Sequence, residues 1–177
     1  MKFSFTPVRT ALQTPLGPMT LAAHNDVLIG VWFDGQRHQP DPLQWPTAND
    51  HPVLRATAEQ LQQYFAQERS HFDLPLGLGY GTAFQQRVWQ ALRTIAPGHT
   101  LVYGQLSQYL GQPTAVRAVA AAIGRNPISI VVPCHRVLGA KGALTGYAGG
   151  LKRKAALLML EKKLTQAPET KLSAITP

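Results

Sequence analysis

Short apolar runs alternate with turn residues in the first third of the chain, and this pattern predicts a small antiparallel sheet. The runs TALQT, PLGPMTLAAH and VLIGVWF follow one another over residues 8–33, and Asn25-Asp26 between the last two indicates a hairpin turn. Residues 35–50 are polar with three prolines, which favours a loop. Apolar positions return at helical spacing over residues 51–67, so we expect a helix packed on the sheet. The aromatic residues of these segments are interpreted as core: Trp32, Phe33, Tyr64 and Phe65.

Residues 74–82, LPLGLGYGT, are rich in Gly and Pro and predict a boundary between two units. We place an N-terminal domain at 1–79 and a C-terminal domain at 80–164. The second domain begins with an amphipathic pattern over 83–95, which predicts a helix that ends at Pro97-Gly98.

Two further short helices are predicted at 103–110 and 114–124, joined by a Gly-containing turn, with Thr114 as the N-cap of the second. This is a helix-turn-helix pattern, in which the second helix meets DNA. Its small residues and lone Arg117 would let the backbone approach a groove floor, although small residues equally fit tight helix packing. The small residues are Ala115, Ala118, Ala121 and Ala122.

The apolar run ISIVV at 128–132 is interpreted as a buried strand, followed by a Gly-rich loop at 141–150 and a last helix at 151–164. The tail at 165–177 is polar with two prolines, and we expect it to be disordered. The predicted class is α+β: a small N-terminal antiparallel sheet with a helix, followed by a mainly helical C-terminal domain with a winged helix-turn-helix.

Charge divides the chain into two unlike halves. The net charge of the 177 residues is +8, but residues 1–79 carry five Lys/Arg against seven Asp/Glu, and residues 80–177 carry twelve against two. A basic second half suits a polyanion partner, or simply a solvated basic surface. No run approaches the roughly 18 apolar residues of a membrane span, and the N-terminus lacks an apolar signal-peptide core. We therefore expect a cytoplasmic protein with no membrane partner.

Cys134 is the only cysteine, which excludes an internal disulfide and a Cys-rich zinc site, and the six scattered histidines form no metal-binding pair. A lone cysteine more often packs as a small apolar residue. Here it stands between Pro133 and His135, and a neighbouring imidazole can remove a thiol proton directly or through one water. The two side chains can meet only if the chain turns sharply at this point.

The stretch IGRNPISIVVPCHRV, with VYGQLSQYLGQPTAVRAVAAAIG before it and TGYAGG after it, closely resembles the 6-O-alkylguanine-DNA alkyltransferases, also called methylated-DNA-protein-cysteine methyltransferases. The likeness covers 84–164; the N-terminal third is similar only in layout, including PLGPM and GVWF. It implies a ribonuclease H-like first domain and DNA repair by irreversible transfer of the alkyl group from 6-O-alkylguanine, and from 4-O-methylthymine, to Cys134. It also implies a monomer that acts once on alkylated double-stranded DNA without a cofactor.

The resemblance assigns roles residue by residue. Cys134 would accept the alkyl group, His135 would act as general base through a water, and Glu161 would orient His135. Asn126 would brace the turn that holds the site. Tyr103 would donate to guanine N3 and favour extrusion of the nucleotide, which costs a few kcal/mol.

Further family positions concern DNA and the base pocket. Arg117 would fill the space left by the extruded base, on a helix that enters the minor groove. The other implied DNA contacts are Thr114, Ala115, Ala118, Ala121, Arg125 and Arg136. The implied pocket residues are Val137, Tyr147, Ala148 and Ser129.

Two departures from the family bear on the substrate. Ser129 stands where some members have proline, and Thr145 where glycine can occur, so we expect poorer acceptance of benzyl than of methyl adducts. The alternatives are a DNA lesion binder without activity, against which Cys134 itself argues, and a cysteine hydrolase, which lacks an oxyanion-hole motif.

Overall fold

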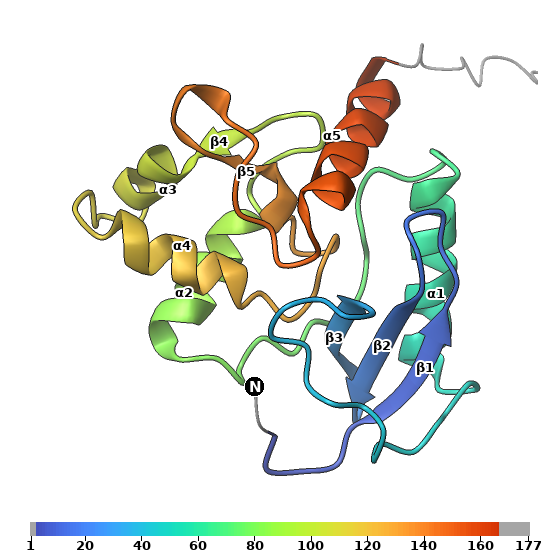
Figure 1. Ribbon diagram of the computed structural model, residues 1–177. Coiled ribbons are helices and arrows are strands. Elements are labelled where there is room, and N and C mark those ends of the chain that lie inside the picture. The colour runs from blue at the N-terminus through green and yellow to red at the C-terminus, as the bar shows by residue number, and fades with distance from the viewer. Residues whose placement is uncertain (1–2, 167–177) are drawn as a thin grey trace, which may run out of the picture.

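The N-terminal unit is a three-stranded antiparallel sheet with one helix on it. The computed structural model describes residues 3–166 (Figure 1). Strands β1 (Val8–Leu12), β2 (Met19–His24) and β3 (Val27–Phe33) lie in the order β1-β2-β3, with Asn25 at φ 48° in the predicted hairpin. Helix α1 (Pro52–Phe65) covers one face, and an aromatic cluster that includes Trp32 covers the other. The predicted sheet and helix are confirmed.

The C-terminal unit is mainly helical. Thr82 and Gln85 form a capping box that starts α2, because each side chain bonds the other's backbone N–H. A two-stranded parallel ladder, β4 with β5, stands beside the helix pair α3 and α4. The bounds are α2 Ala83–Leu92, β4 Leu101–Val102, α3 Tyr103–Tyr109, α4 Val116–Gly124, β5 Val137–Leu138 and α5 Leu151–Gln166. The predicted α+β class with a helix-turn-helix is confirmed.

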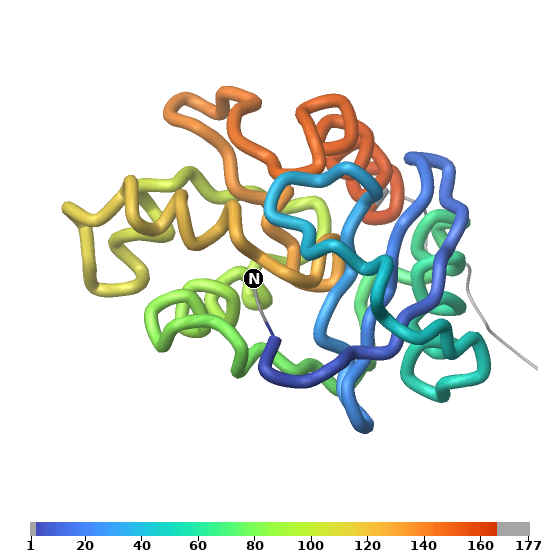
Figure 2. The backbone as a smooth tube through the Cα atoms, turned by 60° about the horizontal axis from the view of Figure 1, so that its bottom comes forward, coloured from blue at the N-terminus to red at the C-terminus, as the bar shows by residue number. Residues whose placement is uncertain are grey.

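The two units share one apolar core and are joined through β3. The N–H of Val31 donates to the carbonyl of Pro127 at 2.9 Å, and the N–H of Ser129 donates back to Val31 at 2.8 Å. The loop after β3 crosses toward the second unit, as Figure 2 shows, and there the N–H of Arg37 donates to Ala148 at 3.1 Å. The segment before Cys134 is thus bonded to the sheet edge.

The strand predicted at 128–132 is wrong. Ile128 makes one isolated bridge, to Val31, and the chain then turns, with Ile130 at φ 72°. The run is apolar because it is buried between the two units, and a buried turn is as apolar as a buried strand. Its backbone is satisfied by turn bonds and by the Asn126 side chain.

Three predicted helix ends also differ. Helix α4 begins at Val116 with Ala115 at the N-cap position and no side-chain cap within the described residues, so Thr114 is not its cap. Helix α2 ends at Leu92, three residues early. Helix α5 runs to Gln166, into the predicted tail, and 167–177 lie outside the described residues. Within residues 3–166, no helix has the length and apolar character that a bilayer crossing needs.

Candidate active site

Cys134 begins a 3-10 turn, Cys134–Arg136, and is 4% exposed. The predicted sharp turn at the cysteine is therefore present. Asn126 Nδ2 donates to Cys134 Sγ at 3.1 Å and to the carbonyl of Val132 at 2.8 Å, while its Oδ1 accepts from Ile128 N at 3.0 Å. Burial raises the pKa of the thiol, more than the Asn126 bond lowers it. The thiol is therefore protonated at neutral pH and needs a base.

His135 supplies a base of the right kind. It is fully buried, and its Nε2 lies 2.7 Å from Glu161 Oε1. Burial lowers the pKa of His135 more than Glu161 raises it, so the imidazole is neutral at pH 7. A neutral ring that donates from Nε2 to a carboxylate carries its lone pair on Nδ1. Within residues 3–166 this buried Nδ1 has no hydrogen-bond partner, which leaves it free to take a proton.

The Glu161 carboxylate is held by more than the histidine. Arg136 binds it with two nitrogens, Nε to Oε2 and Nη2 to Oε1, each at 2.8 Å. Tyr64 of α1 donates its hydroxyl to Oε1 at 2.8 Å. Burial alone would raise the pKa of Glu161, but the bonds from His135 and Arg136 outweigh it and hold that pKa well below its usual range. The carboxylate therefore stays ionised.

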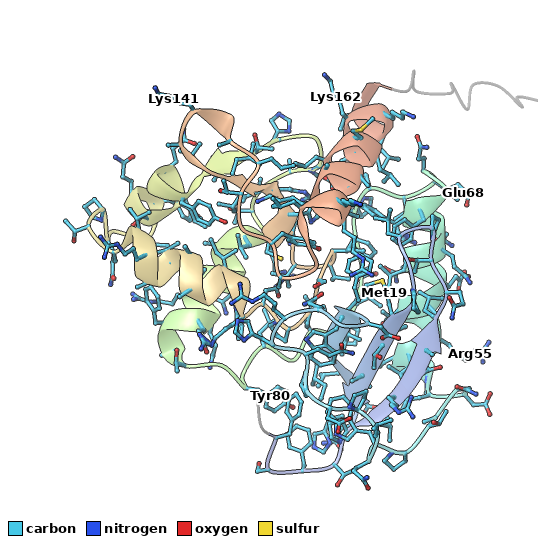
Figure 3. The ribbon with its side chains drawn as sticks, viewed as in Figure 1. Met19, Arg55, Glu68, Tyr80, Lys141 and Lys162 are labelled. Carbon is cyan, nitrogen blue, oxygen red and sulfur yellow. The ribbon has the colours of Figure 1, made fainter. Side chains whose placement is uncertain are left out.

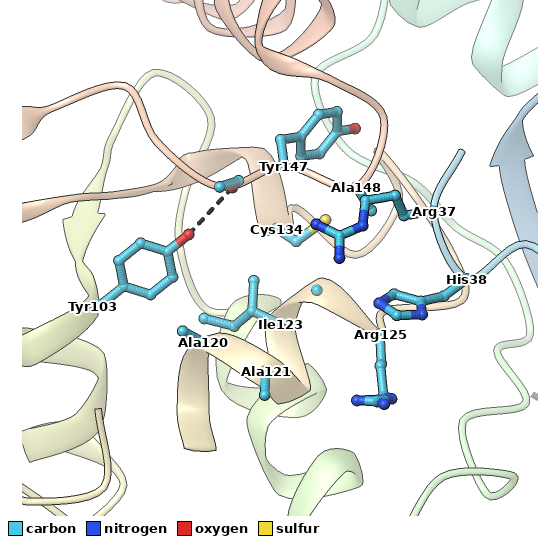
Figure 4. A pocket seen from close by; sticks show the side chains of 12 residues that line it. Arg37, His38, Tyr103, Ala120, Ala121, Ile123, Arg125, Cys134, Tyr147 and Ala148 are labelled. Atoms are coloured by element: carbon cyan, nitrogen blue, oxygen red, sulfur yellow. Dashed lines mark hydrogen bonds between the residues drawn. The ribbon is translucent and has the colours of Figure 1, made fainter. Parts of the chain in front are cut away.

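A cavity of about 410 Å³ opens beside the thiol (Figure 4). The hydroxyl of Tyr103 stands at its edge and donates to the carbonyl of Gly146 at 3.2 Å. Of the predicted site residues, six line this cavity: Tyr103, Ala121, Arg125, Cys134, Tyr147 and Ala148. The Tyr147 hydroxyl is buried without a hydrogen-bond partner in the described part of the chain. The volume falls in the range of small-molecule pockets, so one base fits.

Two family models match this chain. Residues 83–163 match the DNA binding domain of 6-O-methylguanine DNA methyltransferase, and residues 8–78 match its ribonuclease-like domain. The chain belongs to the 6-O-methylguanine DNA methyltransferase family.

Relatives resemble the chain along most of its length. A methylated-DNA–protein-cysteine methyltransferase of Mycobacterium bovis is 48% identical over 159 residues, which cover 90% of this chain and 94% of the relative. One of the same name from Methanosarcina acetivorans is 45% identical over 150 residues, covering 84% and 94%. The crystal structure of Mycobacterium tuberculosis OGT in complex with DNA superposes with a TM-score of 0.81 at 46% identity, covering 89% and 94%.

On α4, the helix that the sequence pattern predicts to meet DNA, the predicted contact residues lie outward. Arg117, Ala118 and Ala121 are exposed, and Ala115 is half-buried at the N-cap. Thr114 is exposed in the turn before the helix. Exposed cations of the same half include Lys141 and Lys162, which project outward in Figure 3.

Three predicted site residues lie elsewhere. Arg136 is 5% exposed and bound to Glu161 and to the carbonyl of Ile95, so its prediction as a DNA contact is wrong: a buried cation keeps its internal partners. Ser129 and Val137 are also buried, and the described lining of the cavity does not include them.

The Ser129 hydroxyl donates to Gln36 Oε1 at 3.0 Å, and the Val137 carbonyl accepts from Lys154. Thr145 likewise does not belong to the described lining. The expected poorer acceptance of benzyl adducts was based on Ser129 and Thr145, and neither residue belongs to the described lining of the cavity.

The sequence interpretation missed several residues at the site, among them Arg37, His38 and Lys154. Arg37 and His38 line the cavity from the loop after β3, and the one available signal was a pair of basic residues in an acidic half. Lys154 is fully buried on α5 and donates to the carbonyls of Val137, Thr145 and Gly146, which fixes the Gly-rich loop. Within residues 3–166, no three His, Cys, Asp or Glu side chains gather as metal ligands.

Proposed function

We propose that this protein repairs DNA by transferring the alkyl group of 6-O-alkylguanine to Cys134, irreversibly and once per molecule. One observation carries the proposal: the only thiol of the chain faces a cavity of base size and stands next to a buried His135–Glu161 pair whose Nδ1 is free. Relatives named as methylated-DNA–protein-cysteine methyltransferases, and one solved in complex with DNA, support it.

The transfer balances without a cofactor. His135 Nδ1 takes the thiol proton through a bridging water, and the thiolate attacks the alkyl carbon. The S–C bond forms as the C–O6 bond breaks, the electron pair goes to guanine, and the proton returns to guanine N1. Tyr103 donates to guanine N3 as charge develops on the base. The thioether is not a leaving group, so one molecule repairs one lesion.

DNA binding is assigned to α4. Its exposed small residues, Ala118 and Ala121, allow close approach to the minor groove, and Arg117 occupies the space of the extruded nucleotide. Extrusion costs a few kcal/mol, which this cation and the base cavity offset. 4-O-methylthymine is a second substrate, because it carries the same alkoxy group beside a ring nitrogen.

The protein acts as a monomer in the cytoplasm. A monomer suffices because one chain carries the thiol, the base and the carboxylate on Cys134, His135 and Glu161. No step of the transfer requires a second copy.

The test uses duplex DNA with 6-O-[³H-methyl]guanine and a molar excess of lesion. We expect one equivalent of label on the wild-type protein and one added methyl on the peptide that contains Cys134, measured by mass spectrometry. Cys134→Ala should take up no label and still bind the duplex. A wild-type protein that binds the duplex but takes up no label would indicate a lesion binder, and release of more than one equivalent of label into solution would indicate a hydrolase.

A further inference from the structure

The carboxylate of Glu161 receives donors from both units of the fold. Tyr64 lies on α1, 97 positions away in sequence, and is fully buried. Its hydroxyl donates to Oε1 at 2.8 Å, and the same oxygen accepts from His135 Nε2 at 2.7 Å and from Arg136 Nη2 at 2.8 Å. Tyr64 therefore binds the same carboxylate oxygen of Glu161 that binds the imidazole of His135.

Packing alone does not require this contact. Arg136 already fixes the plane of the carboxylate with its two parallel bonds, so Oε1 would stay in place without Tyr64. Burial first, and then Glu161, raise the pKa of the Tyr64 hydroxyl, so it remains protonated and donates at every working pH. The Tyr64 hydroxyl therefore donates to Oε1 at all these pH values, and this hydrogen bond reduces the negative charge that Oε1 offers to other donors.

We propose that Tyr64 is a positioning residue of the transfer reaction, through which the N-terminal unit sets the strength of His135 as a base. The inference rests on the proposed function. A third donor on Oε1 makes that oxygen a weaker partner for a protonated imidazole, and so favours the neutral ring that can accept the thiol proton. The first domain thereby takes part in the chemistry as well as in the fold.

The other charged groups around His135 do not mask the effect of Tyr64 on the protonation of the ring. Among the described residues, Glu161 is the one anion that favours the imidazolium, while the cations Arg136 and Lys154 disfavour it. The neutral thiol of Cys134 adds no charge until it reacts. The charged groups that act on the ring in the described residues are Glu161, Arg136 and Lys154. Cys134 is its neighbour in the chain, and Tyr64 acts on it through Glu161.

The experiment measures the first-order transfer rate at saturating methylated duplex as a function of pH. The Tyr64→Phe substitution keeps the ring and removes the hydroxyl, so Glu161 binds the imidazolium of His135 more strongly and the pKa of His135 rises. The acid limb of the pH–rate profile, where the rate falls because His135 is protonated, should therefore move to higher pH. We expect a shift of about half to one unit, which is a roughly three- to tenfold slower transfer on the acid side with convergence above the limb. Affinity for DNA should not change.

Thr57→Val is the matched control. Thr57 is also fully buried on α1, but its hydroxyl donates to Val53 O of its own helix at 2.7 Å and does not touch Glu161. This variant loses a buried hydroxyl from the same helix, and its pH profile should overlay that of the wild type. A shift in Thr57→Val equal to that in Tyr64→Phe would attribute the effect to packing and overturn the inference.

A second substitution tests the opposite direction. Incorporation of 3-fluorotyrosine at Tyr64 keeps the size of the side chain and makes its hydroxyl a stronger donor, so the acid limb should move to lower pH. This variant decides the matter if Tyr64→Phe does not fold. An unmoved limb, or a limb that moves the same way in both variants, overturns the inference while wild-type transfer proceeds. A wild-type protein that takes up no methyl refutes the proposed function instead.

Discussion

Replacement of Asn126 by alanine should loosen the turn that presents the thiol. Asn126 is 3% exposed, and its amide bonds both ends of the segment from Ile128 to Cys134. The carbonyls that it contacts keep other partners: Val132 O still accepts from Cys134 N, and Ile128 O still accepts from Val132 N. The N–H of Ile128 has Asn126 Oδ1 as its partner, and the substitution leaves it buried and unpaired.

The magnitude follows from these contacts. An orphaned buried N–H costs about 1–3 kcal/mol, and the lost bond to Val132 about 1 kcal/mol more. The free energy of unfolding should therefore fall by about 2–4 kcal/mol, and a loss of 3 kcal/mol lowers Tm by roughly 6–12 °C in a chain of this size. The thiol also loses a donor that lowers its pKa, so transfer should slow by about tenfold or more.

Urea unfolding and single-turnover transfer measure the two effects separately. Asn49→Ala is the control, because Asn49 is an exposed asparagine that accepts one bond from Thr10 Oγ1. It should change the unfolding free energy by no more than about 0.5 kcal/mol. The expected decrease in Tm is roughly 6–12 °C. An Asn126→Ala protein whose Tm lies within about 2 °C of the wild-type value, and which transfers the alkyl group at the wild-type rate, would refute the reasoning.

Three further predictions concern other parts of the site. Arg117→Ala should slow repair of duplex DNA about tenfold or more and leave the reaction with free 6-O-methylguanine unchanged, because only in the duplex does an extruded nucleotide leave a gap in the base stack that a side chain must fill. Equal losses of rate on both substrates would contradict this. Lys154→Met keeps the apolar stem but removes the ammonium from three carbonyls, and should lower the unfolding free energy by about 2–4 kcal/mol in urea titrations. Glu161 has a folded-state pKa well below its usual range, whereas the unfolded chain titrates near about 4.3. The unfolded state therefore binds more protons as pH falls below about 5, and stability drops there. The decline of the urea midpoint between pH 6 and 4 should be shallower in Glu161→Gln, and an equal decline would contradict the assignment.

Local patterns in the sequence were sufficient for most elements. Alternation and turn residues located the sheet and its hairpin, and helical spacing located α1 and the helix pair. They failed at 128–132, where burial without regular pairing gave the same apolar run as a strand. Periodicity reports which positions are buried, and it says little about backbone shape where the segment is short.

The sequence by itself determined the thiol and its neighbouring imidazole, because their adjacency is covalent, and it determined the family through the motif around them. Only the tertiary structure decided which polar and charged side chains are buried. From the sequence, Arg136 was expected to contact DNA, Tyr64 was interpreted as plain core, and Lys154 carried no prediction. All three instead serve buried acceptors near Cys134. A buried polar group is recognised by its partner, and these partners lie up to 97 positions away, beyond the reach of any local pattern.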